Sequence, residues 1–284
     1  MTKNAICDII TDILNGLFKG RVLMNQDMQF LLAQLDGYNK IYQVKLKSCL
    51  TLDGFYSWVR EEMSHLSNAL ERPGVPDLSN DEEMQRIFES ERLGHNRAFD
   101  VMHQHVGPRV QLDGLFIRAL NRAMLQDTMP DAAGKYRQCQ AWALGSRSRY
   151  TRYEKIPAAM CDLIEAYHAS GKHPILRAVD LHNDFVRIHP FEDGNGRAGR
   201  LLMNWSLMSH HYFPVIIAPQ ARNAYISALE YYSTSDGQSN DIHLFLMQQM
   251  ASSFLSLSER LDTYPRRLVP AKAPRVSDAS HTRA

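Results

Sequence analysis

Residues 189–200 read His-Pro-Phe-Glu-Asp-Gly-Asn-Gly-Arg-Ala-Gly-Arg, a short polar stretch between two segments rich in apolar residues. On both sides of it, apolar side chains recur at the spacing of one face of a helix. The recurring positions are Ala178, Leu181, His182, Phe185 and Ile188 before the stretch, and Leu201, Leu202, Trp205 and Met208 after it. The pattern predicts a helix, a polar loop and a second helix, each with an apolar face directed into a core.

The loop has the composition of an anion-binding site. Gly194, Asn195 and Gly196 open the second helix, where the first backbone N–H groups have no helical partner and the helix dipole is positive. Because glycine has no Cβ, the backbone can approach a ligand closely and can adopt positive φ. The loop therefore predicts a seat for phosphate at a helix N-terminus.

Charged side chains around the loop supply the groups needed for chemistry on a phosphate. Arg197 and Arg200 lie one helical turn apart, so both guanidinium groups can reach neighbouring phosphates. The carboxylate of Asp193 suits Mg²⁺ that is bound jointly with phosphate oxygens. His189, with an ordinary pKa near about 6.5, can accept a proton at neutral pH.

Two other interpretations of these residues explain less. Gly194, Gly196 and Gly199 fit the dinucleotide pattern G-x-G-x-x-G, which requires a preceding strand and an acidic residue about 20 positions later. Here the preceding residues have helical spacing, and residues 212–214 are Tyr-Phe-Pro. A plain helix-turn-helix corner accounts neither for the Gly-Asn-Gly nor for the clustered charges. Phe191 is interpreted as an anchor in the core, because it is a lone aromatic residue in a polar loop.

The stretch resembles the signature His-Pro-Phe-x-Asp-Gly-Asn-Gly-Arg-x-x-Arg of Fic-domain proteins, most of which transfer AMP from ATP to a protein hydroxyl. The resemblance implies that His189 deprotonates the target side chain and that Asp193 binds Mg²⁺. It also implies that Asn195 and the loop amides hold the α-phosphate region, while Arg197 and Arg200 engage the β- and γ-phosphates. A related branch phosphorylates its targets and lacks these glycines and the second arginine, so this sequence departs from that branch.

The composition indicates a globular protein with a full core, since 44% of its 284 residues are hydrophobic and 22% are charged. A net charge of +1 gives no general electrostatic reason to expect nucleic acid or a membrane as a partner. The four cysteines are widely spaced, which favours reduced, mostly buried thiols in a cytosolic protein over a disulfide framework. They are Cys7, Cys49, Cys139 and Cys161.

The N-terminal residues have isoleucine and leucine at helical spacing from Ile6 to Leu17, interrupted by Asp8 and Asp12. A secretory signal has a positive start and an unbroken apolar run, so we expect a core-facing first helix instead. No apolar run approaches the roughly 18 residues of a membrane-spanning helix. We therefore expect a cytoplasmic protein, or one delivered into a host cell without a cleavable signal.

The rest of the chain reads as a series of helices, so the predicted fold class is mainly α. The resemblance implies a Fic-type helical bundle with one short β-hairpin, divided into N-terminal helices (1–65), a core (66–262) and a disordered basic tail (263–284). The predicted helices are 27–43, 52–70, one carrying Met84 to Glu91, one through Phe99 and Met102, one capped by Asp113, 156–168, one from Pro219 through Leu229, and 241–261.

The hairpin is predicted between residues 134 and 155. Residues 134–137 resemble the family's Gly-x-aromatic-Arg segment, 138–144 have the pattern of a short strand, and 145–153 fit its return. In the family this hairpin clamps the target by strand-like backbone contacts. The resemblance thus implies a protein target that presents a hydroxyl to residues 145–155. An ordinary exposed basic loop explains the arginines of this segment equally well.

Residues 222–225 resemble the family's segment leading to the adenine pocket, and Tyr232 or the loop after it would then touch the base. Tyr225 and Tyr232 also fit as core residues, which is the interpretation we favour.

A second resemblance lies upstream, where Ser67 and Glu71 match the Ser/Thr-x-x-x-Glu inhibitory motif that many Fic proteins carry on a helix. The next residue is Arg72, where the family has Gly or Asn. Ser67 and Glu71 lie on one helix face, so both can point at the active site. We expect Glu71 to pair with Arg200 and to deprive the ATP γ-phosphate of that arginine. The alternative is a solvated glutamate that pairs locally with Arg72.

The resemblance implies that the protein is a protein adenylyltransferase that is autoinhibited by Glu71, with ATP as its substrate and Mg²⁺ as its cofactor. A second hypothesis keeps the site but has Glu71 orient a water that removes AMP from a modified partner. A third, of another class, is a non-catalytic adaptor that binds nucleotide. The sequence does not decide the oligomeric state, and a homodimer that shields or releases Glu71 is consistent with it.

Overall fold

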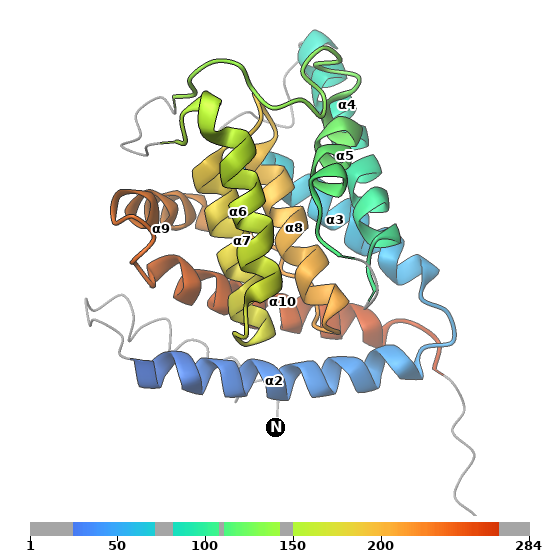
Figure 1. Cartoon of the computed structure of the whole chain (residues 1–284). Coiled ribbons are helices and arrows are strands. Elements are labelled where there is room, and N and C mark those ends of the chain that lie inside the picture. The colour runs from blue at the N-terminus through green and yellow to red at the C-terminus, as the bar shows by residue number, and fades with distance from the viewer. Residues whose placement is uncertain (1–24, 72–81, 108–110, 143–149, 267–284) are drawn as a thin grey trace, which may run out of the picture.

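A computed structural model describes residues 25–71, 82–107, 111–142 and 150–266 of the chain. These residues form nine α-helices and two short 3₁₀ helices, and they contain no strand beyond one isolated bridge between Cys49 and Arg266 (Figure 1). The mainly α fold class is therefore confirmed. The helices are α2 (Asn25–Ser48), α3 (Asp53–Glu71), α4 (Glu82–Gln104), α5 (Gly114–Leu125), α6 (Ile156–Ala169), α7 (Pro174–Ile188), α8 (Asn195–Ser209), α9 (Arg222–Thr234) and α10 (Asp241–Asp262), with 3₁₀ turns at Tyr153–Lys155 and Pro219–Ala221.

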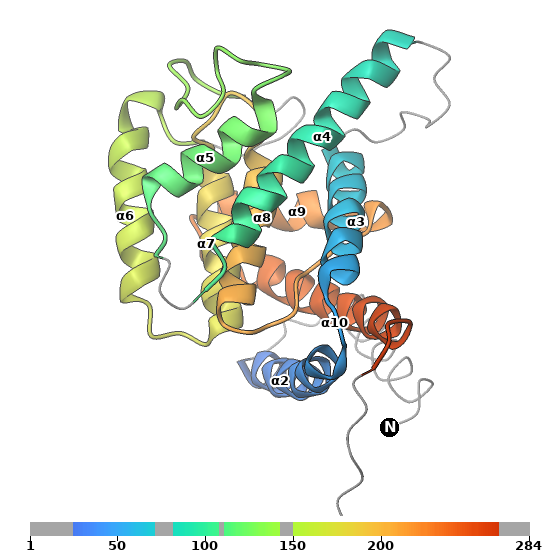
Figure 2. The same ribbon diagram turned by 90° about the vertical axis from the view of Figure 1, so that its right-hand side faces the viewer.

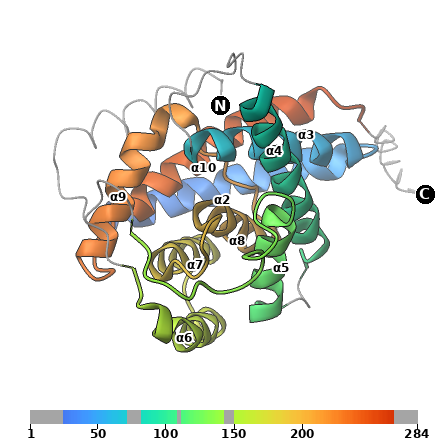
Figure 3. The same cartoon turned by 90° about the horizontal axis from the view of Figure 1, so that it is seen from above.

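The helix α8 lies at the centre of the bundle. Seen from above, α7 and α8 are enclosed by α4 and α5 on one side, α9 on the other, and α2 and α10 behind (Figure 3). Every residue of α8 except Gly196 is buried. A Cβ on Gly199 would lie 2.9 Å from a methyl carbon of Val186 on α7, so this glycine lets the two helices pack closely. The predicted helix-loop-helix is thus the core of the fold.

The N-terminal part of the described chain packs along one end of this bundle. Helix α2 lies across the end below α10 (Figures 1 and 2), with the rings of Tyr38 and Phe254 stacked at 4.7 Å between centroids. Helix α3 runs unbroken from Asp53 to Glu71, so the domain boundary predicted at 65/66 falls within it. The division into N-terminal helices and core stays a prediction.

Helix α4 corrects one sequence prediction. Two helices were expected, one carrying Met84 to Glu91 and one through Phe99 and Met102, but α4 continues through both. Gly94, in its middle, is not a break, because a single glycine costs a helix only about 1 kcal/mol. It lies where α4 crosses α5, and a Cβ there would collide with the backbone carbonyl oxygen of Met124.

This contact yields a stability prediction. Gly94→Ala is expected to lower the free energy of unfolding by about 2 kcal/mol or more, because the methyl group meets backbone that cannot rotate away. Gly37→Ala is the matched control, since Gly37 lies inside α2 with open space around its Cα. That substitution should raise stability by about 0.5–1 kcal/mol. Urea unfolding of both variants checks the pair, and equal effects would contradict the packing argument.

The remaining helices agree with the sequence predictions within a few residues. Asp113 caps α5, accepting a hydrogen bond from the Phe116 N–H at 2.7 Å, and Pro157 lies in the first turn of α6. None of the helices in the described ranges is both long enough and apolar enough to cross a bilayer. The predicted first helix, the cap at 79–81 and the basic tail beyond Arg266 lie outside the described residues.

The predicted hairpin is not formed in its described parts. Residues 134–142, here called the first arm, and 150–152, the second arm, contain no strand; residues 143–149 lie outside the description. The physical reason is that backbone carbonyls of both arms, those of Cys139 and Thr151, accept hydrogen bonds from the side chain of Arg137 instead of from backbone N–H groups of the opposite arm.

The thiols are less buried than predicted. Of the cysteines in the described residues, Cys49 is buried but Cys139 and Cys161 are exposed, and none of the three is in a disulfide. Cys139 lies in the first arm and Cys161 on an exposed face of α6, so neither side chain packs into the core. The prediction of mostly buried thiols was wrong for these two positions.

Candidate active site

The loop of residues 189–194 is closed by one side chain. Asn195 accepts a hydrogen bond from the Phe191 N–H and donates one to the Phe191 carbonyl, both at 2.9 Å. Phe191 itself is fully buried, as the sequence predicted. The amide of Asn195 therefore shapes the loop from within, which leaves ligand binding to the surrounding backbone and charged groups.

The N-terminus of α8 has the geometry of an anion site. Gly194 is its N-cap with φ of 77°, a left-handed conformation that glycine adopts without strain. The first helical hydrogen bond runs from Ala198 N–H to the Gly194 carbonyl at 2.8 Å. The N–H groups of Asn195, Gly196 and Arg197 precede it, so they have no acceptor within the helix and point toward its positive end.

A residue that the sequence analysis did not single out holds this loop in place. Asn121 of α5 is fully buried; its side chain donates to the Asp193 carbonyl at 3.0 Å and accepts from the Gly134 N–H at 2.9 Å. Asn121 thereby joins the loop of residues 189–194 to the start of the first arm. The signal was present in the sequence, because Asn121 falls on the apolar face of α5 between Leu120 and Met124.

Arg197 and Asp193 are paired with each other. Arg197 is buried and donates to the Asp193 carboxylate at 2.8 Å and to the side-chain oxygen of Asn68 at 3.3 Å. The Asp193 side chain is half exposed at the rim of the site. Within the described residues no three acidic, histidine or cysteine side chains gather as a ready metal cage. A magnesium ion here would therefore take Asp193 and complete its shell with phosphate oxygens and water, a donor set that suits it.

Arg200 is held by the helix that carries the predicted inhibitory motif. The buried Arg200 guanidinium donates to the Glu71 carboxylate at 2.6 Å and to the hydroxyl and carbonyl of Ser67, each at 3.0 Å. Burial lowers the pKa of Arg200, but the charge and hydrogen bond of Glu71 outweigh it and the pKa is raised overall. The expected pairing of Glu71 with Arg200 is present in the structure.

Glu71 also reaches the anion site itself. A Cβ on Gly196 would lie only 2.5 Å from a carboxylate oxygen of Glu71, so the carboxylate lies directly against the first turn of α8. Arg222, at the start of α9, donates to the carbonyl of Leu70 at 2.6 Å and fixes the end of α3 from the other side. The glycine therefore allows the close approach of either a phosphate or Glu71, but not both.

His189 is placed at the end of α7 in a left-handed conformation, with φ of 54° and ψ of 59°. Its ring stacks on Tyr150 of the second arm, with centroids 3.9 Å apart, and Nδ1 is buried without a hydrogen-bond partner among the described residues. Burial lowers the pKa of His189 to about 4; the charge of Arg137 adds to this, whereas Glu71 and Asp193 oppose it. The imidazole is neutral at physiological pH and able to accept a proton.

Four of these groups line a cavity of about 320 Å³, large enough for a mononucleotide, whereas Asp193, Asn195 and Arg197 are not among its lining residues. His189, Gly196, Arg200 and Glu71 form one end of it, and Trp142, an exposed residue of the first arm, contributes to its wall. Other lining residues are Leu70, Tyr150, Asn183, Val186, Arg187, Arg222, Tyr225, Ile226, Leu229, Glu230, Tyr232 and Ser233.

Tyr225 and Tyr232 are buried, as the core interpretation held, and both also line the cavity. The Tyr225 hydroxyl lies 2.8 Å from Nε2 of His182, whose Nδ1 lies 2.8 Å from the side-chain oxygen of Asn183. The two interpretations of the tyrosines were therefore not exclusive.

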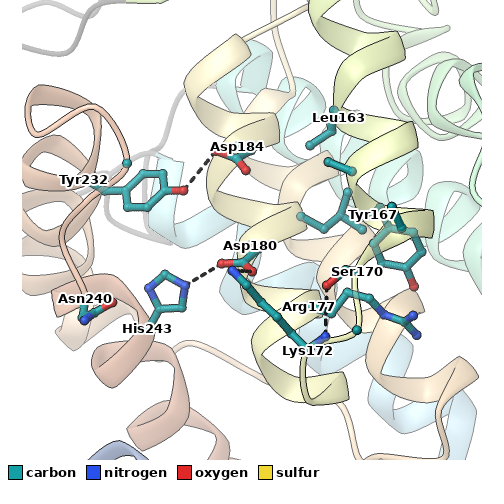
Figure 4. A pocket seen from close by; sticks show the side chains of 15 residues that line it. Leu163, Tyr167, Ser170, Lys172, Arg177, Asp180, Asp184, Tyr232, Asn240 and His243 are labelled. Atoms are coloured by element: carbon teal, nitrogen blue, oxygen red, sulfur yellow. Dashed lines mark hydrogen bonds and ion pairs between the residues drawn. The ribbon is translucent and has the colours of Figure 1, made fainter. Parts of the chain in front are cut away.

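A second, larger cavity of about 490 Å³ lies between α6, α7, α9 and α10 (Figure 4). Its charged groups are already paired: Asp180 binds His243 at 2.8 Å and Lys172 at 2.7 Å, and Asp184 accepts from Tyr232 at 3.0 Å. Only Tyr232 lines both cavities. None of the site residues predicted from the sequence lines this cavity, so we assign the chemistry to the smaller one.

Two buried histidines, His95 and His182, and the partly buried His189 make stability depend on pH. Burial lowers the pKa values of His95, His182 and His189 from 6.5 to about 3, 4 and 4. Between pH 6.5 and 4 the unfolded chain binds protons that the folded chain does not, so the free energy of unfolding should fall by several kcal/mol as the pH is lowered through this window. Above pH 6.5 the titration of these groups does not change the free energy of unfolding.

Urea unfolding at pH 7.5 and pH 5 measures this loss. His95→Met is expected to reduce it, because methionine fills the site without binding a proton. A free energy of unfolding that is equal at the two pH values would contradict the burial of these imidazoles.

The fold and site together define a helical protein with an anion-binding helix N-terminus, a neutral histidine and an adjoining cavity. The sequence profile of the Fic/DOC family matches residues 111–207, which include the first arm, the second arm and the catalytic loop. This segment of the chain is thus similar to the Fic/DOC family. The match does not extend to α3, which carries Ser67 and Glu71.

Curated relatives include the protein adenylyltransferase Fic of Drosophila yakuba, 27% identical over 213 residues, covering 67% of this chain and 41% of the relative. That of Drosophila virilis is 31% identical over 157 residues, covering 52% and 30%. The chain spans less than half the length of these relatives.

Solved structures with a similar fold include a Fic-domain signaling protein from Bacteroides thetaiotaomicron, with a TM-score of 0.68 at 25% identity, covering 83% of this chain and 98% of that one. Fic-1 from C. elegans has a TM-score of 0.65 at 18% identity, covering 83% and 73%. The fold is therefore shared over most of the chain.

Proposed function

We propose that this protein is a protein adenylyltransferase, which moves AMP from ATP to a hydroxyl group of a protein target. The observation that carries the proposal is a cavity at which a neutral histidine, the first turn of α8 and the buried Arg200 meet. The relatives named protein adenylyltransferase support the same activity.

In the proposed reaction the target hydroxyl attacks the α-phosphorus of ATP. His189 accepts the hydroxyl proton, the bond between the α-phosphorus and the bridging oxygen breaks, and pyrophosphate leaves. The N–H groups at the α8 N-terminus and loop glycines bind the α-phosphate, while Arg197 and Arg200 bind the β- and γ-phosphates. Mg²⁺ held at Asp193 would neutralise phosphate charge. Such transfer depends on positioning and charge stabilisation.

Autoinhibition by Glu71 is part of this proposal. Glu71 and Ser67 accept hydrogen bonds from the Arg200 guanidinium, and the Glu71 carboxylate lies against Gly196, where phosphate would bind. A nucleotide that cannot reach Arg200 has its α-phosphorus out of line with the incoming hydroxyl. A displacement of this kind can lower a rate about 10²-fold.

The target is proposed to be a protein that approaches the cavity along the two arms. Tyr150 of the second arm covers His189, so an entering side chain has to displace or pass this ring. Acceptance of Ser, Thr or Tyr follows from the need for a hydroxyl. Self-association remains a prediction that the single chain does not address.

Mass spectrometry tests the function directly. Wild-type and Glu71→Gly proteins are incubated in cell lysate with Mg²⁺ and, in separate reactions, ATP, UTP, CTP, GTP or a phosphocholine donor. We expect AMP on a Ser, Thr or Tyr of a partner or of the chain itself with ATP. The absence of any donor-dependent modification in both proteins would overturn the proposal, and another donor would correct the nucleotide.

Removal of AMP is a second candidate, favoured by the position of the Glu71 carboxylate on the wall of the same cavity as His189. In that reaction Glu71 would orient a water molecule for attack on the phosphorus of a modified target. Offering an AMP-modified protein to both forms separates the two activities. Hydrolysis by wild type that is lost in Glu71→Gly indicates removal, whereas faster modification by the variant indicates transfer.

A further inference from the structure

Arg137, in the first arm, is among the largest fully buried side chains of the described residues, with 2% of its surface exposed. Its guanidinium donates to four backbone carbonyls: those of His189 and Cys139 at 2.7 Å, Ile188 at 3.5 Å, and Thr151. Its backbone N–H donates to the Pro190 carbonyl at 2.9 Å. One residue thus contacts three separate segments of the chain.

The three segments are those that would act on the target. Cys139 belongs to the first arm and Thr151 to the second, and Tyr150, next to Thr151, stacks on the imidazole of His189. Ile188 and His189 are the point at which α7 ends. The side chain of Arg137 therefore takes the place of the strand pairing that the arms lack and extends it to the general base.

The free-energy cost of burying a guanidinium indicates that this position requires arginine. The hydrogen-bond partners of this guanidinium in the described chain are carbonyl groups, and burial lowers its pKa. A buried cation without a carboxylate is expensive unless its donors are satisfied. Arginine satisfies them because its planar fork has five N–H donors in fixed directions, which neither lysine nor a neutral side chain can match.

The carbonyl of His189 is the most consequential acceptor. His189 is one of three non-glycine residues with positive φ in the described chain, and such a conformation costs about 1–2 kcal/mol unless surrounding contacts hold it. The Arg137 Nε–H bond at 2.7 Å fixes the peptide that follows His189. It thereby fixes the direction in which the imidazole leaves the backbone.

We propose that Arg137 is a positioning residue that joins the two arms and the His189 backbone into one rigid unit, so that a target bound along the arms meets the imidazole in register. The catalytic consequence rests on the proposed function, whereas the structural coupling does not. The positive charge also opposes protonation of the nearby imidazole, so its removal should raise the pKa of His189.

The test uses the full chain in the Glu71→Gly background and three substitutions. Arg137→Met removes charge and donors, and Arg137→Lys keeps the charge but loses the fork. Arg118→Met is the matched control, because Arg118 of α5 donates at 2.8 Å to the Gly134 carbonyl, at the start of the first arm, without a hydrogen bond to the second arm or the loop. Thermal unfolding confirms that each variant is folded.

Three readouts separate positioning from general stability. For Arg137→Met we expect kcat to fall about 10²-fold with KM for ATP changed by less than about threefold. The NMR titration of His189, assigned with His189→Asn, should move to higher pH, and hydrogen exchange should rise together in both arms and at residues 188–190. Arg137→Lys should show the lowered kcat without the titration shift, and Arg118→Met should resemble the parent.

The outcomes also separate this inference from the proposed function. Unchanged kcat, exchange and titration in a folded Arg137→Met would overturn the inference even if the parent transfers AMP. If the parent transfers no nucleotide, but Arg137→Met still raises exchange in both arms and shifts the His189 titration, the coupling stands and the adenylyltransferase proposal falls. Should Arg137→Met not fold, Arg137→Lys decides by its kcat and by exchange in the arms.

Discussion

Replacing Glu71 by glycine is expected to raise the rate of AMP transfer about 10²-fold, because the substitution releases Arg200 and clears the space beside Gly196. In the wild type the buried guanidinium is bound by Glu71 at 2.6 Å and by Ser67. Without the carboxylate, its Nη2 group can turn to the γ-phosphate. Incorporation of labelled AMP into protein, measured at saturating ATP and Mg²⁺, reports the change.

Two controls identify the cause of that increase. Glu71→Gln keeps the shape and a hydrogen-bonding oxygen but loses the charge, so its rate should lie between those of wild type and Glu71→Gly. Glu62→Gly, in the middle of the same helix, costs the helix more than a glycine at its last residue but lies away from the site, so it should leave the rate unchanged. If Glu71→Gly were no faster than wild type, the carboxylate would not be a brake.

The second large effect concerns His189, tested in the Glu71→Gly background. His189→Asn is expected to lower AMP transfer by about 10²–10⁴-fold, because the hydroxyl loses its general base. Asparagine is preferred to alanine here, since it tolerates the left-handed backbone at this position, with φ of 54°, and so preserves the loop. Single-turnover labelling with a fixed ATP concentration measures the loss.

Nucleotide affinity provides the control for this substitution. The phosphate-binding groups are the α8 N-terminus and the arginines, so binding of a fluorescent ATP analogue should change by less than about threefold. His168→Asn, an exposed position on α6, should transfer AMP at the parent rate. Full labelling activity in His189→Asn would contradict the assignment of the base.

The sequence predicted the local parts of the site with little error. The loop, its glycines and the helix that follows them depend on short-range spacing, and the structure has them at 189–200 as expected. Asp113 as a cap and Pro157 in a first turn are also local signals. The pairing of Glu71 with Arg200 was anticipated as well, although it joins residues far apart, because a motif on α3 indicated it.

Where the sequence misled, the deciding interaction was not local. Two helices were expected within 82–104, but the chain continues as α4, and the lack of a side chain at Gly94 serves the contact of α4 with α5. Residues 138–153 have the composition of a hairpin, yet the side chain of Arg137 takes the carbonyls that a strand pair would use. Asn121 was overlooked because its two partners, Asp193 and Gly134, are distant in the chain.

By itself, the sequence determined the helical class and the position of the glycine-rich loop at the start of α8, because helix periodicity, capping and glycine placement act over a few residues. The role of His189 as the base stays a prediction from the motif of that loop. The tertiary structure alone decided that His189 is neutral, that Arg137 ties both arms to it and that Glu71 lies against Gly196. These properties arise from burial and from contacts between segments that only the packing of α3, α7 and α8 brings together, which no short-range pattern encodes.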